Sequence, residues 1–130
     1  MDCSTIFYVN LILLLVVIIF VSKGYLESFS AGPTPKGPEV VYLYWSSCGH
    51  CKNFIPEWNK FEKISITPTV KMETKDKGVD AFLAIAKQGG FFKGYPCIFF
   101  LNTDGTAVPY SGQRTAQDIL SWQKNLMSGR

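Results

Sequence analysis

The distribution of apolar residues divides the chain into an N-terminal apolar run and a longer region of short, periodic segments. Residues 6–21 are apolar apart from Asn10 and predict a membrane-targeting segment. At 16 residues this run is shorter than the roughly 20 that cross a bilayer, although Ser22 and Tyr25 can lengthen it at the interface. We therefore expect residues 1–22 to be either a signal anchor or a cleaved signal peptide.

The flanks of this run favour retention as a single-pass anchor. Asp2 is the only charged residue before the run, whereas a signal peptide normally begins with basic residues. Small residues such as Ser22 and Gly24 leave room for cleavage, and a cleaved chain would be secreted. Lys23 on the far flank favours a cytoplasmic domain, whereas the cysteine chemistry described below favours an oxidising compartment.

A change in composition marks a linker at residues 23–38. Gly, Pro and Ser are frequent there, and the prolines gather in residues 32–38. Neither helix nor strand is expected at this proline density. The linker should hold a folded domain, residues 39–130, away from the membrane.

Periodicity in residues 39–130 predicts seven elements in the order βαβαββα. Strands are expected where β-branched and aromatic residues cluster or alternate, and helices where apolar residues recur every three or four positions. The expected strands are residues 39–45, 67–73, 97–101 and 106–110, and the expected helices are 48–63, a second from Val79 to Gly89, and a third from Thr115 to about Met127. A parallel βαβ unit followed by a hairpin and a closing helix makes an α/β fold, with a central mixed sheet flanked by helices.

Three local signals support this order. Residues 102–105, Asn-Thr-Asp-Gly, predict a hairpin turn between the last two strands. Pro109 places the final strand at a sheet edge, because proline cannot donate to a ladder. Thr115 followed by Asp118 resembles a capping box at the start of the last helix.

Length, charge and cysteine count narrow the class of protein. With 130 residues, 47% of them hydrophobic, the chain can form one core beside its N-terminal appendage. The formal charge of +3 comes from scattered lysines, so we expect no nucleic-acid binding. Only Cys48 and Cys51 of the four cysteines are close in sequence, which is not the disulfide framework of a small secreted scaffold.

Cys48 and Cys51 form the most informative motif of the chain. They directly follow a predicted strand and open a predicted helix, whose free N–H groups and positive dipole end favour a thiolate. The two residues are also close enough in sequence to form a disulfide with each other. Half of a zinc site and two buried thiols are the alternatives, but a zinc site of this style needs a second ligand pair, which the sequence lacks. The redox hypothesis requires no organic cofactor and no metal.

Four short motifs, in this order and spacing, resemble the catalytic thioredoxin-fold domain of protein disulfide isomerases. They are Cys48-Gly49-His50-Cys51-Lys52, Pro56-Glu57-Trp58, Gly94-Tyr95-Pro96 and Tyr110-Ser111-Gly112-Gln113-Arg114. The similarity covers about residues 40–124. It implies that Cys48 attacks the substrate and that Cys51 resolves the mixed disulfide.

The resemblance also gives roles to residues outside the dithiol. Pro96 should be a cis-proline whose loop, with Tyr95, faces the dithiol and receives the substrate. Arg114 should approach the site and favour the thiolate of Cys51. An incidental role for Pro96 or Arg114 is the alternative in each case.

His50 lies with Gly49 between the two cysteines and is expected to tune them. Its imidazole can donate to the Cys48 thiolate, which stabilises the reduced form and makes the disulfide more oxidising. By analogy, the potential should be near roughly −180 mV, the value for protein disulfide isomerase, and not near the roughly −270 mV of thioredoxin. The alternative is a surface histidine without coupling to the sulfurs.

Three departures from the isomerase pattern stand out. Tyr42 occupies the place of a buried acid in the strand before the dithiol, so resolution by Cys51 is expected to be slow. Ser47 replaces the tryptophan that usually precedes the first cysteine, and Trp45 lies two residues earlier. The leading β-α unit has no counterpart, which predicts a shortened thioredoxin fold with one less protected sheet edge.

Two further cysteines lie outside the matched motifs. Cys97, next to Pro96, is either a buried core thiol or a third thiol close to Cys48. Cys3 precedes the apolar run and is incidental, an acylation site, or lost if the N-terminal segment is cleaved.

These patterns together predict a membrane-tethered thiol–disulfide oxidoreductase and isomerase. Its partners would be proteins with thiols or disulfides, a redox donor or acceptor, and the membrane. The alternatives are a reductase facing the cytosol and a thioredoxin-fold binding module without catalysis.

Overall fold

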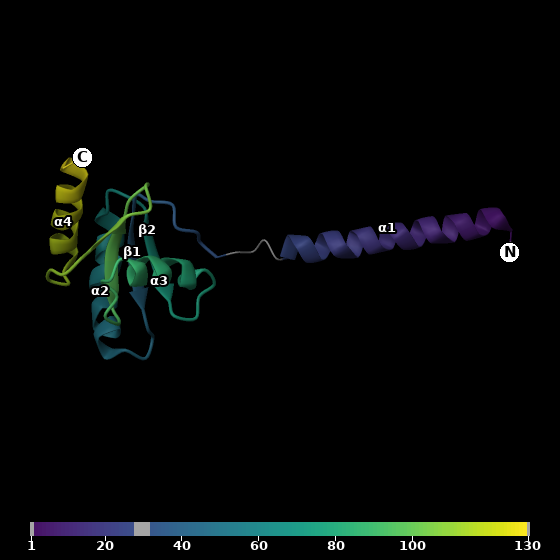
Figure 1. Ribbon diagram of the computed structural model, residues 1–130. Coiled ribbons are helices and arrows are strands. Elements are labelled where there is room, and N and C mark those ends of the chain that lie inside the picture. Colours follow the sequence, from purple (N-terminus) through teal and green to yellow (C-terminus); the bar gives the residue numbers. More distant parts are fainter. Residues whose placement is uncertain (1, 28–31, 130) are drawn as a thin grey trace. The chain divides into compact units, whose positions relative to one another are not determined.

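The computed structural model describes residues 2–27 and 32–129. The chain forms two separate units, residues 1–31 and 32–130. Figure 1 shows a single helix, α1 (Cys3–Glu27), in the first unit and all other elements in the second.

Helix α1 is 25 residues long, and its residues Cys3–Ser22 are long and apolar enough to cross a membrane. A signal sequence near the N-terminus has the same properties. The helix extends through residues 23–27, where the sequence predicted linker and no helix, so that expectation is wrong for these five residues. The physical reason is that the first proline comes only at Pro33, and Gly24 alone costs a helix about 1 kcal/mol.

The second unit is built on a four-stranded sheet in the order β2-β1-β3-β4. Its strands are β1 (Glu39–Tyr44), β2 (Thr69–Glu73), β3 (Cys97–Leu101) and β4 (Ala107–Pro109). β1 pairs parallel with β2 and antiparallel with β3, and β3 pairs antiparallel with β4. The predicted α/β fold with a mixed sheet and Pro109 on an edge strand is confirmed. In the part of the chain that the structure describes, no strand pairs with the outer edge of β2.

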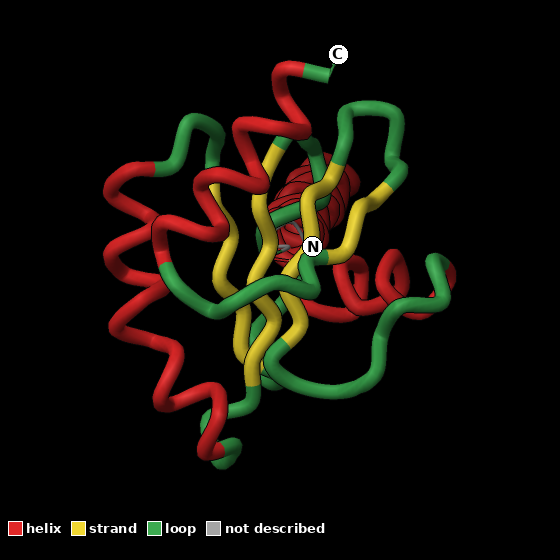
Figure 2. The backbone as a smooth tube through the Cα atoms, turned by 90° about the vertical axis from the view of Figure 1, so that its left-hand side faces the viewer, coloured by secondary structure: helices red, strands yellow, loops and turns green. Residues whose placement is uncertain are grey.

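Helices cover both faces of this sheet, as Figure 2 shows. They are α2 (Gly49–Ile64), α3 (Val79–Gln88) and α4 (Ala116–Ser128), in the predicted order. Alternate residues of β1 separate the core into two clusters, because successive side chains of a strand point to opposite faces. Val40 and Tyr42 pack with apolar residues of α2 and α4, whereas Val41 and Leu43 pack with those of α3.

The N-terminus of α4 confirms the predicted capping signal. Thr115 is the N-cap residue, and its hydroxyl accepts a hydrogen bond from the backbone N–H of Asp118 at 3.2 Å. The cap matters for the site described next, because Arg114 directly precedes it.

Candidate active site

Cys48 lies at the junction of β1 and α2, where it is the N-cap residue of the helix. Its backbone is extended, with φ −82° and ψ 122°, and its carbonyl accepts the first helical hydrogen bond from the N–H of Lys52 at 3.1 Å. The Cys48 N–H donates to the carbonyl of Trp45 at 2.9 Å, which closes the turn after β1. The sulfur is therefore placed at the end of the helix where N–H groups lack helical partners.

A carboxylate on the neighbouring strand holds this turn. Glu73, the last residue of β2, accepts hydrogen bonds from the Ser46 hydroxyl at 3.0 Å and the Ser46 N–H at 3.3 Å. The parallel pairing of β1 with β2 brings Glu73 opposite Tyr44, two residues before Ser46. The loop that carries Cys48 is thus fixed from two strands.

The two sulfurs of the dithiol lie in different surroundings. Cys48 is half-buried and Cys51, one turn along α2, is fully buried, and both are free thiols. Hydrogen bonds from the backbone and thiol of Cys51, together with the charge of Arg114, lower the pKa of Cys48. Burial, followed by the neighbouring Cys48, raises the pKa of Cys51. The arrangement provides one accessible thiolate and one protected thiol.

The loop before β3 lies next to the dithiol although it is distant from it in sequence. The Tyr95–Pro96 peptide bond is cis, as the resemblance predicted. The Cys48 thiol lies 3.8 Å from the carbonyl oxygen of Tyr95 and donates to it. The structure therefore brings together Cys48, Tyr95 and Pro96, while the binding of a substrate by these residues stays a prediction.

Arg114, Gly49 and His50 are all exposed beside the dithiol. The expected effect of Arg114 was on Cys51, whereas its charge here lowers the pKa of Cys48. His50 lowers the pKa of Cys48 through its backbone N–H, and the tuning role expected of its imidazole stays a prediction.

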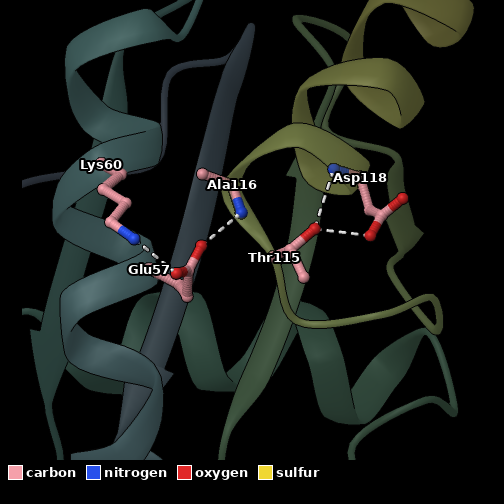
Figure 3. Close-up of polar contacts among 5 residues, drawn as sticks. All are labelled: Glu57, Lys60, Thr115, Ala116 and Asp118. Atoms are coloured by element: carbon pink, nitrogen blue, oxygen red, sulfur yellow. Dashed lines mark hydrogen bonds and ion pairs between the residues drawn. The ribbon is translucent and has the colours of Figure 1, made fainter.

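Contacts between α2 and the start of α4 hold the segment that directly follows Arg114. Figure 3 shows that the carboxylate of Glu57 accepts a hydrogen bond from the backbone N–H of Ala116 at 3.0 Å. The same carboxylate pairs with the ammonium group of Lys60 at 2.8 Å. Together with the Thr115 cap, these contacts fix the segment that follows Arg114.

Tyr42 is the residue of this site whose contact the sequence did not reveal. It is fully buried on β1, and its hydroxyl donates to the backbone carbonyl of Cys51 at 3.2 Å. Burial and then the neighbouring Cys51 raise the pKa of Tyr42 above the ordinary 10.0. The available signal was its position, two residues before the end of the strand that leads into the dithiol.

The two remaining thiols, Cys97 and Cys3, differ in their surroundings. Cys97 is 7% exposed in the apolar cluster below α3, and burial raises its pKa to about 11. This favours the interpretation as a buried core thiol over that of a third reactive thiol. Cys3 is exposed on α1. Within the described ranges, no three His, Cys, Asp or Glu side chains are grouped so that they could hold a metal ion.

Comparisons with known proteins agree with the geometry. Residues 18–125 match the family model described as thioredoxin. The chain is 39% identical to the protein disulfide-isomerase A6 homolog of Drosophila melanogaster over 88 residues, which are 64% of this chain and 19% of that protein. It is 34% identical to protein disulfide-isomerase TMX3 of Mus musculus over 107 residues, 78% of this chain and 23% of that protein. The chain thus spans about a fifth of the length of these curated relatives.

Solved structures show the same fold. The first thioredoxin domain of mouse protein disulfide-isomerase A4 matches with a TM-score of 0.52 and 29% identity, over 68% of this chain and 61% of that one. The J-Trx1 fragment of ERdj5 matches with a TM-score of 0.54 over 67% of this chain and 41% of that one, and at 24% identity it supports the fold alone.

Proposed function

The chain belongs to the thioredoxin family, with a domain similar to those of protein disulfide isomerases, and from this premise we propose that it is a thiol–disulfide oxidoreductase. It would form, reduce or rearrange disulfides in other proteins through Cys48 and Cys51. The observation that supports this most directly is the asymmetry of the pair: Cys48 is accessible with a lowered pKa, and Cys51 is buried with a raised one. Two-step disulfide exchange requires one thiolate that attacks the substrate disulfide and a second thiol that later resolves the mixed disulfide.

The proposed reaction has two steps in the reductive direction. The Cys48 thiolate attacks a substrate disulfide, a Cys48–substrate disulfide forms, and the other substrate sulfur leaves as a thiolate. Cys51 then loses its proton to solvent and attacks the sulfur of Cys48, which releases the second substrate thiolate and leaves a Cys48–Cys51 disulfide. The reverse sequence oxidises a substrate dithiol, and escape after the first step allows isomerisation.

The loop at Tyr95 and Pro96 is the proposed substrate-binding element. The Tyr95 carbonyl already accepts a hydrogen bond from the Cys48 thiol at 3.8 Å, so a polypeptide bound along this loop would have its sulfur close to Cys48. Pro96 has no backbone N–H, so at this position the loop can only accept hydrogen bonds from a substrate backbone.

We place the domain at a membrane and in an oxidising compartment. Helix α1 has the length and composition of a membrane span. A disulfide at Cys48 and Cys51 would persist in the endoplasmic reticulum lumen or outside the cell, where thiols are not kept reduced. Cleavage of the N-terminal segment would instead give a secreted protein.

The test is a redox titration of the full chain in detergent micelles against reduced and oxidised glutathione. Alkylation followed by mass spectrometry reports the oxidation of Cys48 and Cys51. We expect a reversible midpoint near roughly −180 mV, the value for protein disulfide isomerase. A midpoint near roughly −270 mV would favour a reductase facing the cytosol.

A binding module without catalysis is the second candidate, and Tyr42 in place of a buried acid favours it. This candidate predicts no reversible Cys48–Cys51 pair in the titration. A further experiment separates the two in cells, where Cys51→Ala should trap mixed disulfides through Cys48. Cys48→Ala together with Cys51→Ala is the matched control, and a failure of Cys51→Ala to trap any protein would contradict catalysis.

A further inference from the structure

We propose that the buried hydroxyl of Tyr42 is the hydrogen-bond donor that stabilises the thiolate of Cys51 when Cys51 resolves a mixed disulfide. Tyr42 would thus support resolution as a neutral donor and not as a charged base. The inference rests on the proposed function, and it concerns the second step of the exchange alone.

Tyr42 contacts the second cysteine of the dithiol through its side chain. The Tyr42 hydroxyl donates to the backbone carbonyl of Cys51 at 3.2 Å, which places it beside the residue whose thiol resolves the mixed disulfide, and the Tyr42 side chain lowers the pKa of that thiol. Both residues are fully buried. Because a phenol O–H can turn between its two orientations in the plane of the ring, we expect the donor to serve the carbonyl before the reaction and the sulfur during it.

Aromatic packing holds the ring in this place. Phe54 meets the Tyr42 ring edge-on with centroids 4.9 Å apart, and the Trp58 centroid lies at 5.0 Å. Tyr44 stacks against it at 5.4 Å. These contacts come from α2 and from β1 itself. We therefore expect the Tyr42 hydroxyl to stay next to Cys51 while the disulfide bonds are exchanged.

The chemistry of resolution calls for such a donor. Burial opposes ionisation of Cys51, whereas hydrogen bonds from the Trp45 backbone and the Tyr42 side chain lower its pKa. A buried carboxylate could take up the proton of Cys51, whereas a phenol with a raised pKa stays neutral and can only donate a hydrogen bond to the thiolate. Hydrogen bonds to a charged group contribute more than those between neutral groups.

The expected effect of Tyr42 falls on one step. The Cys48 thiolate attacks oxidised glutathione, a Cys48–glutathione disulfide forms and one glutathione thiolate leaves. Cys51 then gives its proton to solvent and attacks Cys48, and the second glutathione thiolate leaves as the Cys48–Cys51 disulfide forms. Loss of the Tyr42 hydroxyl should slow this second step about ten-fold at neutral pH, because a hydrogen bond to a charged group is worth about one pKa unit or more.

The experiment uses the full chain in detergent micelles with oxidised glutathione as the probe. Tyr42→Phe keeps the ring and removes the hydroxyl, and Tyr44→Phe is the matched control because Tyr44 is the half-buried ring stacked on Tyr42. Quenching and mass spectrometry follow the Cys48–glutathione disulfide. We expect it to persist about ten-fold longer in Tyr42→Phe, with an unchanged first step, and to be unaffected in Tyr44→Phe.

The pH dependence separates a lost donor from a disturbed fold. In Tyr42→Phe the second step should recover as the pH rises and Cys51 ionises without help, whereas a distorted site would be slow at every pH. An equal second step in Tyr42→Phe and the unaltered chain would overturn the inference.

A second measurement does not depend on catalysis. In a Cys48→Ala background, Tyr42→Phe should raise the pH midpoint for alkylation of Cys51 by about one unit. An unchanged midpoint overturns the role of Tyr42 even where glutathione exchange is normal. A raised midpoint in a chain with no reversible disulfide would instead support the contact and contradict the proposed function.

Discussion

At the scale of single residues, Cys48 and Cys51 differ in both access and proton affinity. The lowered pKa of Cys48, caused first by hydrogen bonds from Cys51, leaves more thiolate at neutral pH than an ordinary cysteine has. Burial acts on Cys51 in the opposite direction. The two thiols therefore differ in their tendency to ionise before a substrate binds.

This difference predicts selective alkylation of the reduced full chain. Iodoacetamide at pH 7 should modify Cys48 several-fold faster than Cys51, because Cys48 is the more exposed sulfur and its pKa is lowered, whereas Cys51 is buried and its pKa is raised. Peptide mapping by mass spectrometry measures the order of labelling. Cys48→Ala is the control: Cys51 should still be labelled more slowly than Cys48 is in the unaltered chain, because burial is the main cause of its raised pKa. Equal rates at the two sulfurs would contradict this difference.

The buried thiol of Cys97 predicts a loss of stability at alkaline pH. Its pKa is raised to about 11 in the folded chain from an ordinary 9.0. Because the folded pKa lies above the unfolded one, the contribution to stability is complete below pH 9 and declines as the pH rises through 11. The decline by pH 11 should be about 2 kcal/mol.

The measurement is urea unfolding under reducing conditions across this pH interval. Cys97→Ala should start from a lower free energy of unfolding, because it leaves a cavity. It should then fall less steeply with pH than the unaltered chain. The tyrosines titrate in both proteins, so the difference between the two slopes isolates Cys97. Parallel slopes would show that Cys97 remains accessible to hydroxide when folded.

At the scale of elements, α4 is anchored by a polar residue inside its apolar face. Gln123 is fully buried, and its side-chain amide donates to the hydroxyls of Ser65 at 2.9 Å and Thr67 at 2.7 Å. Its side-chain oxygen accepts from the N–H of Ile66 at 3.2 Å. The turn between α2 and β2 is therefore tied to α4 by three hydrogen bonds from one side chain.

Removal of this anchor should destabilise the second unit. We expect Gln123→Ala to lower the free energy of unfolding by about 2 to 3 kcal/mol, because it leaves a cavity and unpaired buried groups. Gln117→Ala on the exposed side of the same helix is the matched control and should change stability by less than about 0.5 kcal/mol. Chemical denaturation measures both. A loss at Gln123 no larger than that at Gln117 would mean that the turn finds other partners.

Periodicity in the sequence was sufficient for the order of the elements but not for every buried position. The strand Cys97–Leu101 was predicted to the residue because all five of its side chains are apolar and buried. Gln123 was missed because the sequence does not show that a polar residue on the apolar face of a helix will form three hydrogen bonds with a turn distant in sequence. The helical residues 23–27 were missed because the composition of the whole linker was applied to a part without proline.

In the candidate site, too, some features could be predicted from the sequence and others could not. Cys48, Cys51 and the cis bond before Pro96 followed from motifs that are local in sequence. The contact between the Tyr42 hydroxyl and Cys51 depends on how β1 lies under α2, which only the folded chain reveals. The sequence alone presented Tyr42 as a missing acid.

At the scale of the whole molecule, the chain consists of two units that differ in how far their apolar side chains are buried. The buried core comes entirely from the second unit, while the apolar side chains of α1 that the structure describes are exposed. Such a surface is stable in lipid or detergent and not in water. The domain supplies its own two clusters, on the two faces of its sheet, and has no need of α1 for its core.

This division predicts that membrane association and folding can be separated. In cells, the full chain should stay with the membrane fraction after extraction at high pH, because about 20 apolar residues suffice to span a bilayer. Residues 32–130 alone should be released, yet unfold with the same midpoint in urea as the full chain in detergent and show the same preference for alkylation at Cys48. Release of the full chain together with a shortened N-terminus in mass spectra would instead identify α1 as a cleaved signal. A lower unfolding midpoint for residues 32–130 would mean that α1 contributes to the stability of the domain.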